Sequence, residues 1–78
     1  MLEGLDFEER EIAVQVLAEA WALMTERQRQ CLALCVAGYT QAEVGAALGV
    51  SQTAVHNHFS AAVRKARTIA HQLMESLG

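Results

Sequence analysis

The sequence predicts a small all-α domain of four helices, with a helix-turn-helix and a long C-terminal recognition helix. The 78 residues include no proline and only five glycines, so long helices are allowed and a β-rich fold gains little support. Apolar residues recur at helical spacing in four segments, with helix-capping residues between them. At this length and 53% hydrophobic composition, residues 1–78 are expected to form a single domain around one core.

The first predicted helix covers residues 7–23. Asp6 and Glu9 have the spacing of a capping box, and the acidic residues nearby suit the positive end of a helix dipole. The apolar residues of this helix cover a wider arc than one neighbouring helix needs. Two explanations remain open: the helix is wedged between two helices of its own domain, or it forms a surface for a second copy or another partner.

The second predicted helix covers residues 26–37. Thr25 and Gln28 have the spacing of another capping box at its start, and Gly38 ends it. The local sequence therefore defines both ends of this helix.

Cys31 and Cys35 lie on one face of the second helix, a spacing that suits core packing. No paired ligand signature of the zinc-finger kind accompanies them. Thiols one helical turn apart are also poorly aimed for a disulfide. We therefore interpret both as structural cysteines, and we expect Tyr39 to fill the core with its hydroxyl left in water.

The third predicted helix, residues 41–48, leads into the clearest structural signal in the chain. Thr40 and Glu43 form a third capping box. Gly49 is the residue that most easily takes the left-handed conformation that ends a helix, and Ser51 can cap the next one. So short a connection forces two helices to cross steeply, which predicts a helix-turn-helix.

The last predicted helix covers residues 52–75, and small residues, Gly45 and Ala54, stand where it approaches the third helix. Its apolar residues follow a heptad alternation that continues past the part a helix-turn-helix needs, so its second half requires an apolar partner from this chain or from a second copy. The expected core comprises Val44, Leu48, Val55, Phe59 and Val63. The expected dimer or partner surface comprises Ile12, Val16, Trp21, Ile69 and Leu73.

Four short motifs stand in a fixed order within residues 25–67. They read TERQR at 25–29, AGYT at 37–40, LGVS at 48–51 and VHNHF at 55–59. In this order and spacing they resemble region four of bacterial sigma factors and the output domains of the LuxR class. The resemblance implies a DNA-binding helix-turn-helix, and it also implies the flap of the RNA polymerase β subunit as a docking surface.

In such a motif the start of the second helix enters the major groove of double-stranded DNA, where amides, hydroxyls and imidazoles can pair with base edges. The expected base contacts are Gln52, Thr53, His56, Asn57 and Ser60. Cations farther along this helix, and the start of the preceding helix, are suited to phosphates. The expected phosphate contacts are Thr40, Gln41, Arg64, Lys65 and Arg67. An ordinary polar surface is the alternative for any one of these residues, and His58 is expected to be half-buried in helix packing.

The net charge of −3 conceals an uneven distribution. Residues 1–24 hold six acids and one arginine, whereas residues 51–71 hold three cations and no acid. Sigma recognition helices usually carry cations at their early exposed positions, and this sequence has none there. Because affinity for DNA depends on neutralising phosphates, one copy is expected to bind weakly, and a homodimer or a tether would compensate.

Other classes of function receive no support from the sequence. We expect no enzyme, since there is no nucleophile with a base at family spacing, no phosphate-binding loop and no ligand set for a metal. No cofactor or small-molecule substrate is expected either. No apolar run approaches the length of a membrane span, and the acidic start differs from a signal peptide, so a cytoplasmic protein is expected.

Three functional hypotheses remain. The first is a sequence-specific DNA-binding transcription regulator that acts as a homodimer. The second is a module with the shape of sigma region four that docks on RNA polymerase and modulates transcription through protein contacts, which the acidic first helix favours. The third is a DNA-binding subunit of a phage assembly.

Overall fold

The computed structural model describes residues 4–77 and contains four helices in this part of the chain: α1 (Phe7–Leu23), α2 (Glu26–Val36), α3 (Gln41–Leu48) and α4 (Gln52–Leu77). The predicted all-α class is confirmed. Each helix lies where the sequence placed it, except that α2 ends one residue before its expected end at residue 37 and α4 continues two residues beyond its expected end at residue 75. None of these helices is long and apolar enough to cross a membrane.

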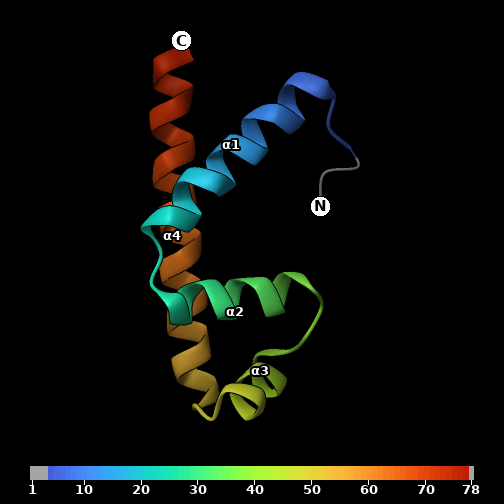
Figure 1. Ribbon diagram of the computed structural model, residues 1–78, viewed down its shortest axis with the longest axis vertical. Helices are drawn as coiled ribbons and strands as arrows, with labels where there is room; N and C mark the ends of the chain where they lie inside the picture. Colours follow the sequence, from blue (N-terminus) through green and yellow to red (C-terminus); the bar gives the residue numbers. More distant parts are fainter. Residues whose placement is uncertain (1–3, 78) are drawn as a thin grey trace.

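Helix α4 is the central helix of the molecule, because each of the other helices packs against it (Figure 1). Helix α1 runs beside its C-terminal half, while α2 and α3 lie beside its N-terminal half. The molecule is elongated, with extents of 42 × 23 × 15 Å. The helix-turn-helix therefore lies at one end of the molecule and α1 at the other.

Capping bonds fix the helix boundaries. The Thr25 hydroxyl accepts the Gln28 amide at 3.2 Å, and the Gln28 side chain accepts the Thr25 amide at 3.0 Å. Thr40 and Glu43 form the same reciprocal pair, with distances of 3.1 and 2.9 Å. These bonds satisfy backbone donors that a helix start leaves unpaired. The Asp6 carboxylate likewise accepts the Glu9 amide at 2.8 Å.

The close approach of α3 and the turn that follows it requires two glycines, one within α3 and one at its end. Gly49 ends α3 with φ at 71°, in the left-handed region. A Cβ atom at Gly45 would lie 2.7 Å from the carbonyl oxygen of Val50, closer than real Cβ contacts. The Ser51 hydroxyl accepts the Ala54 amide at 3.0 Å and so caps α4. The predicted glycine turn and the small residue at the crossing are both present.

A first core lies inside the helix-turn-helix, where Cys31, Val44 and Val55 are completely or almost completely buried. Burial is the main reason that the pKa of the Cys31 thiol is raised, and Cys35 adds to the effect. Both cysteines are free thiols, as expected of structural cysteines.

Leu48 of the expected core is half-buried against this first core, and three further positions differ from the sequence-based expectation. Phe59 and Val63 are only half-buried, because they lie at the edge of the α4 face that packs on α2 and α3. Tyr39 was expected to fill the core, but it is 54% exposed, because the left-handed Gly38 turns the chain outward before α3.

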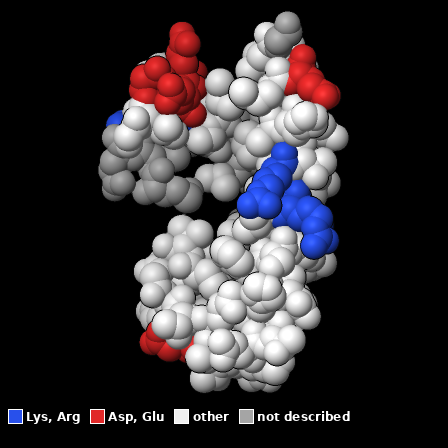
Figure 2. Space-filling view, turned by 180° about the vertical axis from the view of Figure 1, so that it is seen from behind, with Lys and Arg blue, Asp and Glu red and all other residues white. Residues whose placement is uncertain are grey.

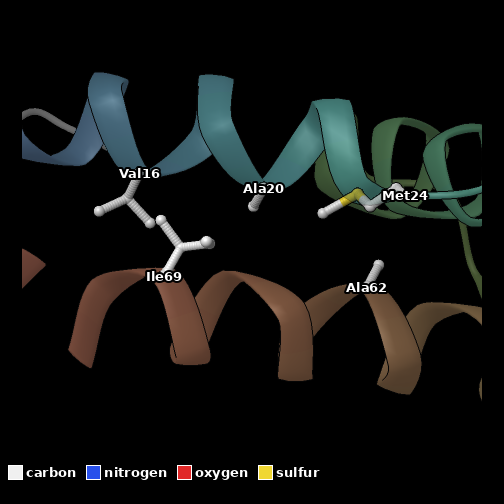
Figure 3. Packing of buried hydrophobic residues seen from close by; sticks show 5 residues of the cluster. All are labelled: Val16, Ala20, Met24, Ala62 and Ile69. Atoms are coloured by element: carbon white, nitrogen blue, oxygen red, sulfur yellow. The ribbon is translucent and has the colours of Figure 1, made fainter. Parts of the chain in front are cut away.

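A second core joins α1 to α4 (Figure 3). Val16, Ala20 and Met24 of α1 pack against Ala62 and Ile69 of α4. Of the two explanations for the wide apolar arc of α1, packing within the same chain therefore accounts for the side that faces α4.

This packing corrects the expected dimer surface. Val16 and Ile69 are buried against each other, and Ile12 and Leu73 are half-buried against the same cluster. Val16 and Ile69 therefore pack within the single chain, and Ile12 and Leu73 are partly covered by it. Trp21 is the exception, with 42% of its surface exposed.

Helix α1 has no basic residue in its own last turn. Its C-terminal carbonyl groups instead accept hydrogen bonds from basic side chains of α2 and α4. Arg29 of α2 donates to the Trp21 carbonyl at 2.7 Å and lies over the Trp21 ring, 5.8 Å from its centroid. Lys65 of α4 donates to the Leu23 carbonyl at 2.8 Å and to the Gln28 side chain at 2.7 Å. Cations suit the negative end of a helix dipole, so these bonds anchor α1 to the rest of the domain.

We predict that Gly45→Ala destabilises the protein by about 1 to 3 kcal/mol, because the added methyl group must displace the backbone at Val50. Urea unfolding with an unchanged m-value would measure the loss. Ala46→Ser, at the next, exposed position, is the control and should change stability by less than about 0.5 kcal/mol. A Gly45→Ala variant of native stability would contradict the close approach.

The capping box of α3 predicts an acid-sensitive contribution to stability. Hydrogen bonds from the Thr40 backbone and side chain lower the pKa of Glu43 in the folded state. A lowered pKa means that this contribution is present above the unfolded-state pKa and is lost as the pH falls through the folded-state value. Glu43→Gln should remove this pH dependence while keeping the box, as Gln28 does in α2. Thermal melts from neutral to acid pH would compare the two proteins.

Candidate nucleic-acid interface

The outer side of α4 presents a row of polar and basic side chains. Thr53, His56, Ser60, Arg64 and Arg67 follow one another at intervals of three or four residues, which places them on one side of the helix. All of them are exposed except Ser60, which is half-buried. Gln52 and Asn57 are also exposed and stand beside this row.

A hydrogen bond joins this row to the start of α3. Gln41, the first residue of α3, lies with its side-chain Nε2 3.3 Å from Nδ1 of His56. With the glutamine amide as donor, Nδ1 is the acceptor, and the neutral imidazole carries its proton on Nε2. The bond links side chains fifteen residues apart across the helix-turn-helix, so it orients the His56 ring relative to both helices.

Two shallow depressions lie along the same side. One, of about 290 Å³, is lined by Gln41, Gln52, Thr53 and His56. The other, of about 340 Å³, is lined by Gln41, His56, Phe59, Ser60, Val63, Arg64 and Arg67. The half-buried Phe59 and Val63 thus contribute apolar surface beside the polar row. The structure brings most of the predicted contact residues together on this concave surface, with Asn57 and Thr40 outside its lining.

Lys65 differs from the sequence-based expectation of a phosphate contact. Its side chain is half-buried, and its ammonium group donates to the Leu23 carbonyl and the Gln28 side chain. The reason is helical geometry, since Lys65 lies on the side of α4 that faces α1 and α2, whereas its neighbour Arg64 faces outward. Lys65 is therefore a structural residue.

The electrostatic surface is uneven. Figure 2 shows basic side chains gathered midway along α4 and acidic side chains at the far end of α1. Residues 52–63, which form the first part of α4, contain no Lys, Arg, Asp or Glu. The polar row therefore begins with neutral side chains, and its basic residues, Arg64 and Arg67, lie farther along α4.

Thr40 is exposed, and its hydroxyl group is engaged within the capping box, where its oxygen accepts the Glu43 amide and the side chain also hydrogen-bonds the Glu43 carboxylate. His58 is half-buried, as the sequence led us to expect. Within residues 4–77, no group of three or more His, Cys, Asp or Glu side chains is arranged to hold a metal ion.

Sequence reasoning missed the Gln41–His56 pair and the surface role of Phe59 and Val63. A helical projection of α4 shows Phe59 and Val63 at the border between the buried and exposed sides. No sequence signal identifies the Gln41–His56 pair, because it depends on the angle at which α3 crosses α4.

Comparison with known protein families identified a match that covers most of the chain. The family model described as bacterial regulatory proteins of the LuxR family matches residues 22–74. The matched range contains α2 and α3 with most of α4, and it leaves nearly all of α1 outside. No curated protein and no solved structure matches the chain.

The different surroundings of two adjacent cations lead to a prediction. Lys65→Met should lower the free energy of unfolding by about 1 to 2 kcal/mol, because it removes charged hydrogen bonds to Leu23 and Gln28 while keeping the apolar stem. Arg64→Met, one position away and exposed, should change it by less than about 0.5 kcal/mol. Chemical denaturation of both variants measures the difference, and equal effects would contradict the assignment of Lys65.

Proposed function

The chain belongs to the LuxR family of bacterial regulatory proteins, a family of DNA-binding transcription regulators, and on this premise we propose that it binds double-stranded DNA with the first half of α4 in the major groove. The observation that carries the proposal is the polar row on the outer side of α4. This row occupies the positions that a helix-turn-helix directs toward base edges.

Sequence-specific reading is proposed for the neutral side chains. The side-chain amides of Gln52 and Asn57 can each form two hydrogen bonds to an adenine, while the hydroxyls of Thr53 and Ser60 can bond to several base edges. His56 is assigned a donor role, because its Nδ1 faces Gln41 and its Nε2–H is left to reach an acceptor such as guanine O6 or N7. Gln41 is thus proposed as the residue that positions His56, in addition to its place near the phosphates.

Phosphate contact is proposed for Arg64 and Arg67, with Thr40 and Gln41 at the start of α3 as a second point of attachment. Both arginines are exposed on the side of the polar row. The amides and the positive dipole end of α3 favour a phosphate near Thr40. With Lys65 engaged inside the protein, only two cations per copy remain for this surface.

Two copies are proposed to bind one DNA site, because two phosphate contacts per copy give little electrostatic affinity. A pair of helix-turn-helix domains would double the number of contacts and read two half-sites. The overall charge of −3 makes this more important, since the acidic residues oppose an approach to DNA.

A salt series tests the electrostatic part. The logarithm of the binding constant should fall with a slope of about −3.6 against the logarithm of salt concentration for two copies, and about −1.8 for one. Arg64→Met should flatten the slope by roughly one unit per copy and weaken all sequences alike. Lys65→Met is the matched control and should leave the slope unchanged in protein that remains folded. Fluorescence anisotropy with labelled duplexes measures both.

Base reading is tested by Asn57→Ala on duplexes selected from a random pool. The variant should lose about 1 to 3 kcal/mol on the best sequence only, with relaxed preference at one base position. A uniform loss on all sequences would show that Asn57 does not read a base.

The same experiments distinguish DNA binding from a second hypothesis, docking on RNA polymerase. The acidic α1 and the absence of charged residues from the first part of α4 would also suit a module that docks on RNA polymerase. Failure to bind any duplex pool at low salt, together with stoichiometric binding to purified RNA polymerase, would replace the DNA proposal with this one.

A further inference from the structure

The side of α1 that faces away from α4 carries a second set of large apolar residues. Phe7, Val14 and Trp21 are 74%, 55% and 42% exposed. They are spaced by seven residues, so they form one stripe along the helix, which we name the α1 stripe. The stripe is separate from the buried face of α1, where Val16 and Ala20 pack on α4.

Part of the α1 stripe, from Phe7 to Val14, borders a shallow depression that does not extend to Trp21. The depression, of about 580 Å³, is lined by Phe7, Arg10, Glu11, Val14, Gln15 and Ala18. The exposed Ala18 leaves space between Val14 and Trp21, as a hole for a large side chain requires. Nearly all of α1 lies outside the range matched by the family model, so DNA binding by the helix-turn-helix does not account for this surface.

The charges around the stripe favour one occupant. The N-terminal end of α1 carries Asp6, Glu8, Glu9 and Glu11 with a single basic residue, Arg10. At the C-terminal end, the Arg29 guanidinium lies over the Trp21 ring. The Phe7 end of the stripe therefore lies in a region of net negative charge and the Trp21 end lies beside Arg29, so a reversed second copy would set acidic residues near an arginine.

We infer that the α1 stripe binds the α1 stripe of a second copy of this chain in an antiparallel helix pair. A two-fold axis near Val14 brings the two Val14 side chains together and sets Phe7 of each copy against Trp21 of the other. Each acidic N-terminal end then lies beside Arg29 of the other copy, whereas a parallel pair would bring the acidic ends together. A two-fold interface requires such self-complementarity.

The shape of the single chain agrees with this pairing. Its radius of gyration is 13.7 Å, compared with about 11.5 Å expected for a compact chain of this length. The difference arises because α1 packs on one side of α4 and leaves its own outer side uncovered. A second copy would cover this side and enlarge a core that is small for a stable domain.

The inference rests on the proposed function, in which two copies of the chain bind one DNA site, and it specifies the surface through which the two copies contact each other. It is tested without DNA. Sedimentation equilibrium of the 78-residue chain over a wide concentration range should show dimers. Val14→Glu should raise the dissociation constant more than roughly 100-fold, since two carboxylates would meet at the axis. Val36→Glu is the matched control, because Val36 on α2 is equally exposed at 56% but lies outside the stripe, and it should remain dimeric.

Two mixing experiments keep the test specific. Val14→Glu and Val14→Lys should each be monomeric alone and should form heterodimers when mixed, which excludes unfolding as the cause. In a Cys35→Ala background, a mixture of Phe7→Cys and Trp21→Cys should form a disulfide between the two variants. A disulfide between two Phe7→Cys chains would indicate a parallel pair and overturn the proposed geometry.

A native chain that is monomeric at every concentration, or a Val14→Glu variant that dimerises normally, would overturn the inference. DNA binding separates this failure from failure of the proposed function. A native chain that is monomeric yet binds duplexes with a slope of about −1.8 would overturn the inference and leave DNA binding by the helix-turn-helix intact. A dimeric protein that binds no duplex would instead contradict the DNA proposal alone.

Discussion

The Lys65 ammonium group connects the two halves of this protein. It donates to the Leu23 carbonyl at the end of α1 and to the Gln28 side chain at the start of α2. The same Gln28 oxygen accepts the Thr25 amide, so the capping box of α2 and the end of α1 share one bonding centre. The centre lies on α4 between Ala62 and Ile69 of the second core, and it sets where α1 stands relative to the helix-turn-helix.

The internal use of cations explains why the polar row on α4 carries so little positive charge. The chain has six Lys and Arg residues. Arg10, Arg29 and Lys65 each bond to a backbone carbonyl, and Arg27 bonds to Gln30. Arg64 and Arg67 are the exposed cations of α4, so in the proposed complex the electrostatic part of DNA binding is modest and neutral hydrogen-bonding groups carry more of the recognition.

Helix α1 has two apolar sides with different surroundings. The side with Val16 and Ala20 completes the core of the single chain, while the side with Phe7, Val14 and Trp21 remains exposed. An amphipathic helix with one neighbour needs only one apolar side. The second apolar side is therefore the clearest feature that the DNA-binding domain itself leaves unexplained.

The sequence alone determined the helices and the turn of this protein, because their signals are local. Capping boxes such as Thr40 with Glu43, and the left-handed Gly49, act over three or four residues and are encoded where they occur. The order of short motifs likewise identified the helix-turn-helix and most of the surface that α4 presents. Periodicity also predicted the burial of Val44 and Val55, since each lies at the centre of an apolar face.

Only the tertiary structure decided which residues far apart in the chain contact each other. Lys65 bonds to a carbonyl 42 residues away, which turns an expected phosphate contact into a structural one. Val16 and Ile69 pair within the chain, and Phe59 and Val63 reach the surface, because the crossing angles of α1 and α3 on α4 select which part of each apolar face is covered. Crossing angles arise from the packing of whole helix surfaces, so no local pattern encodes them.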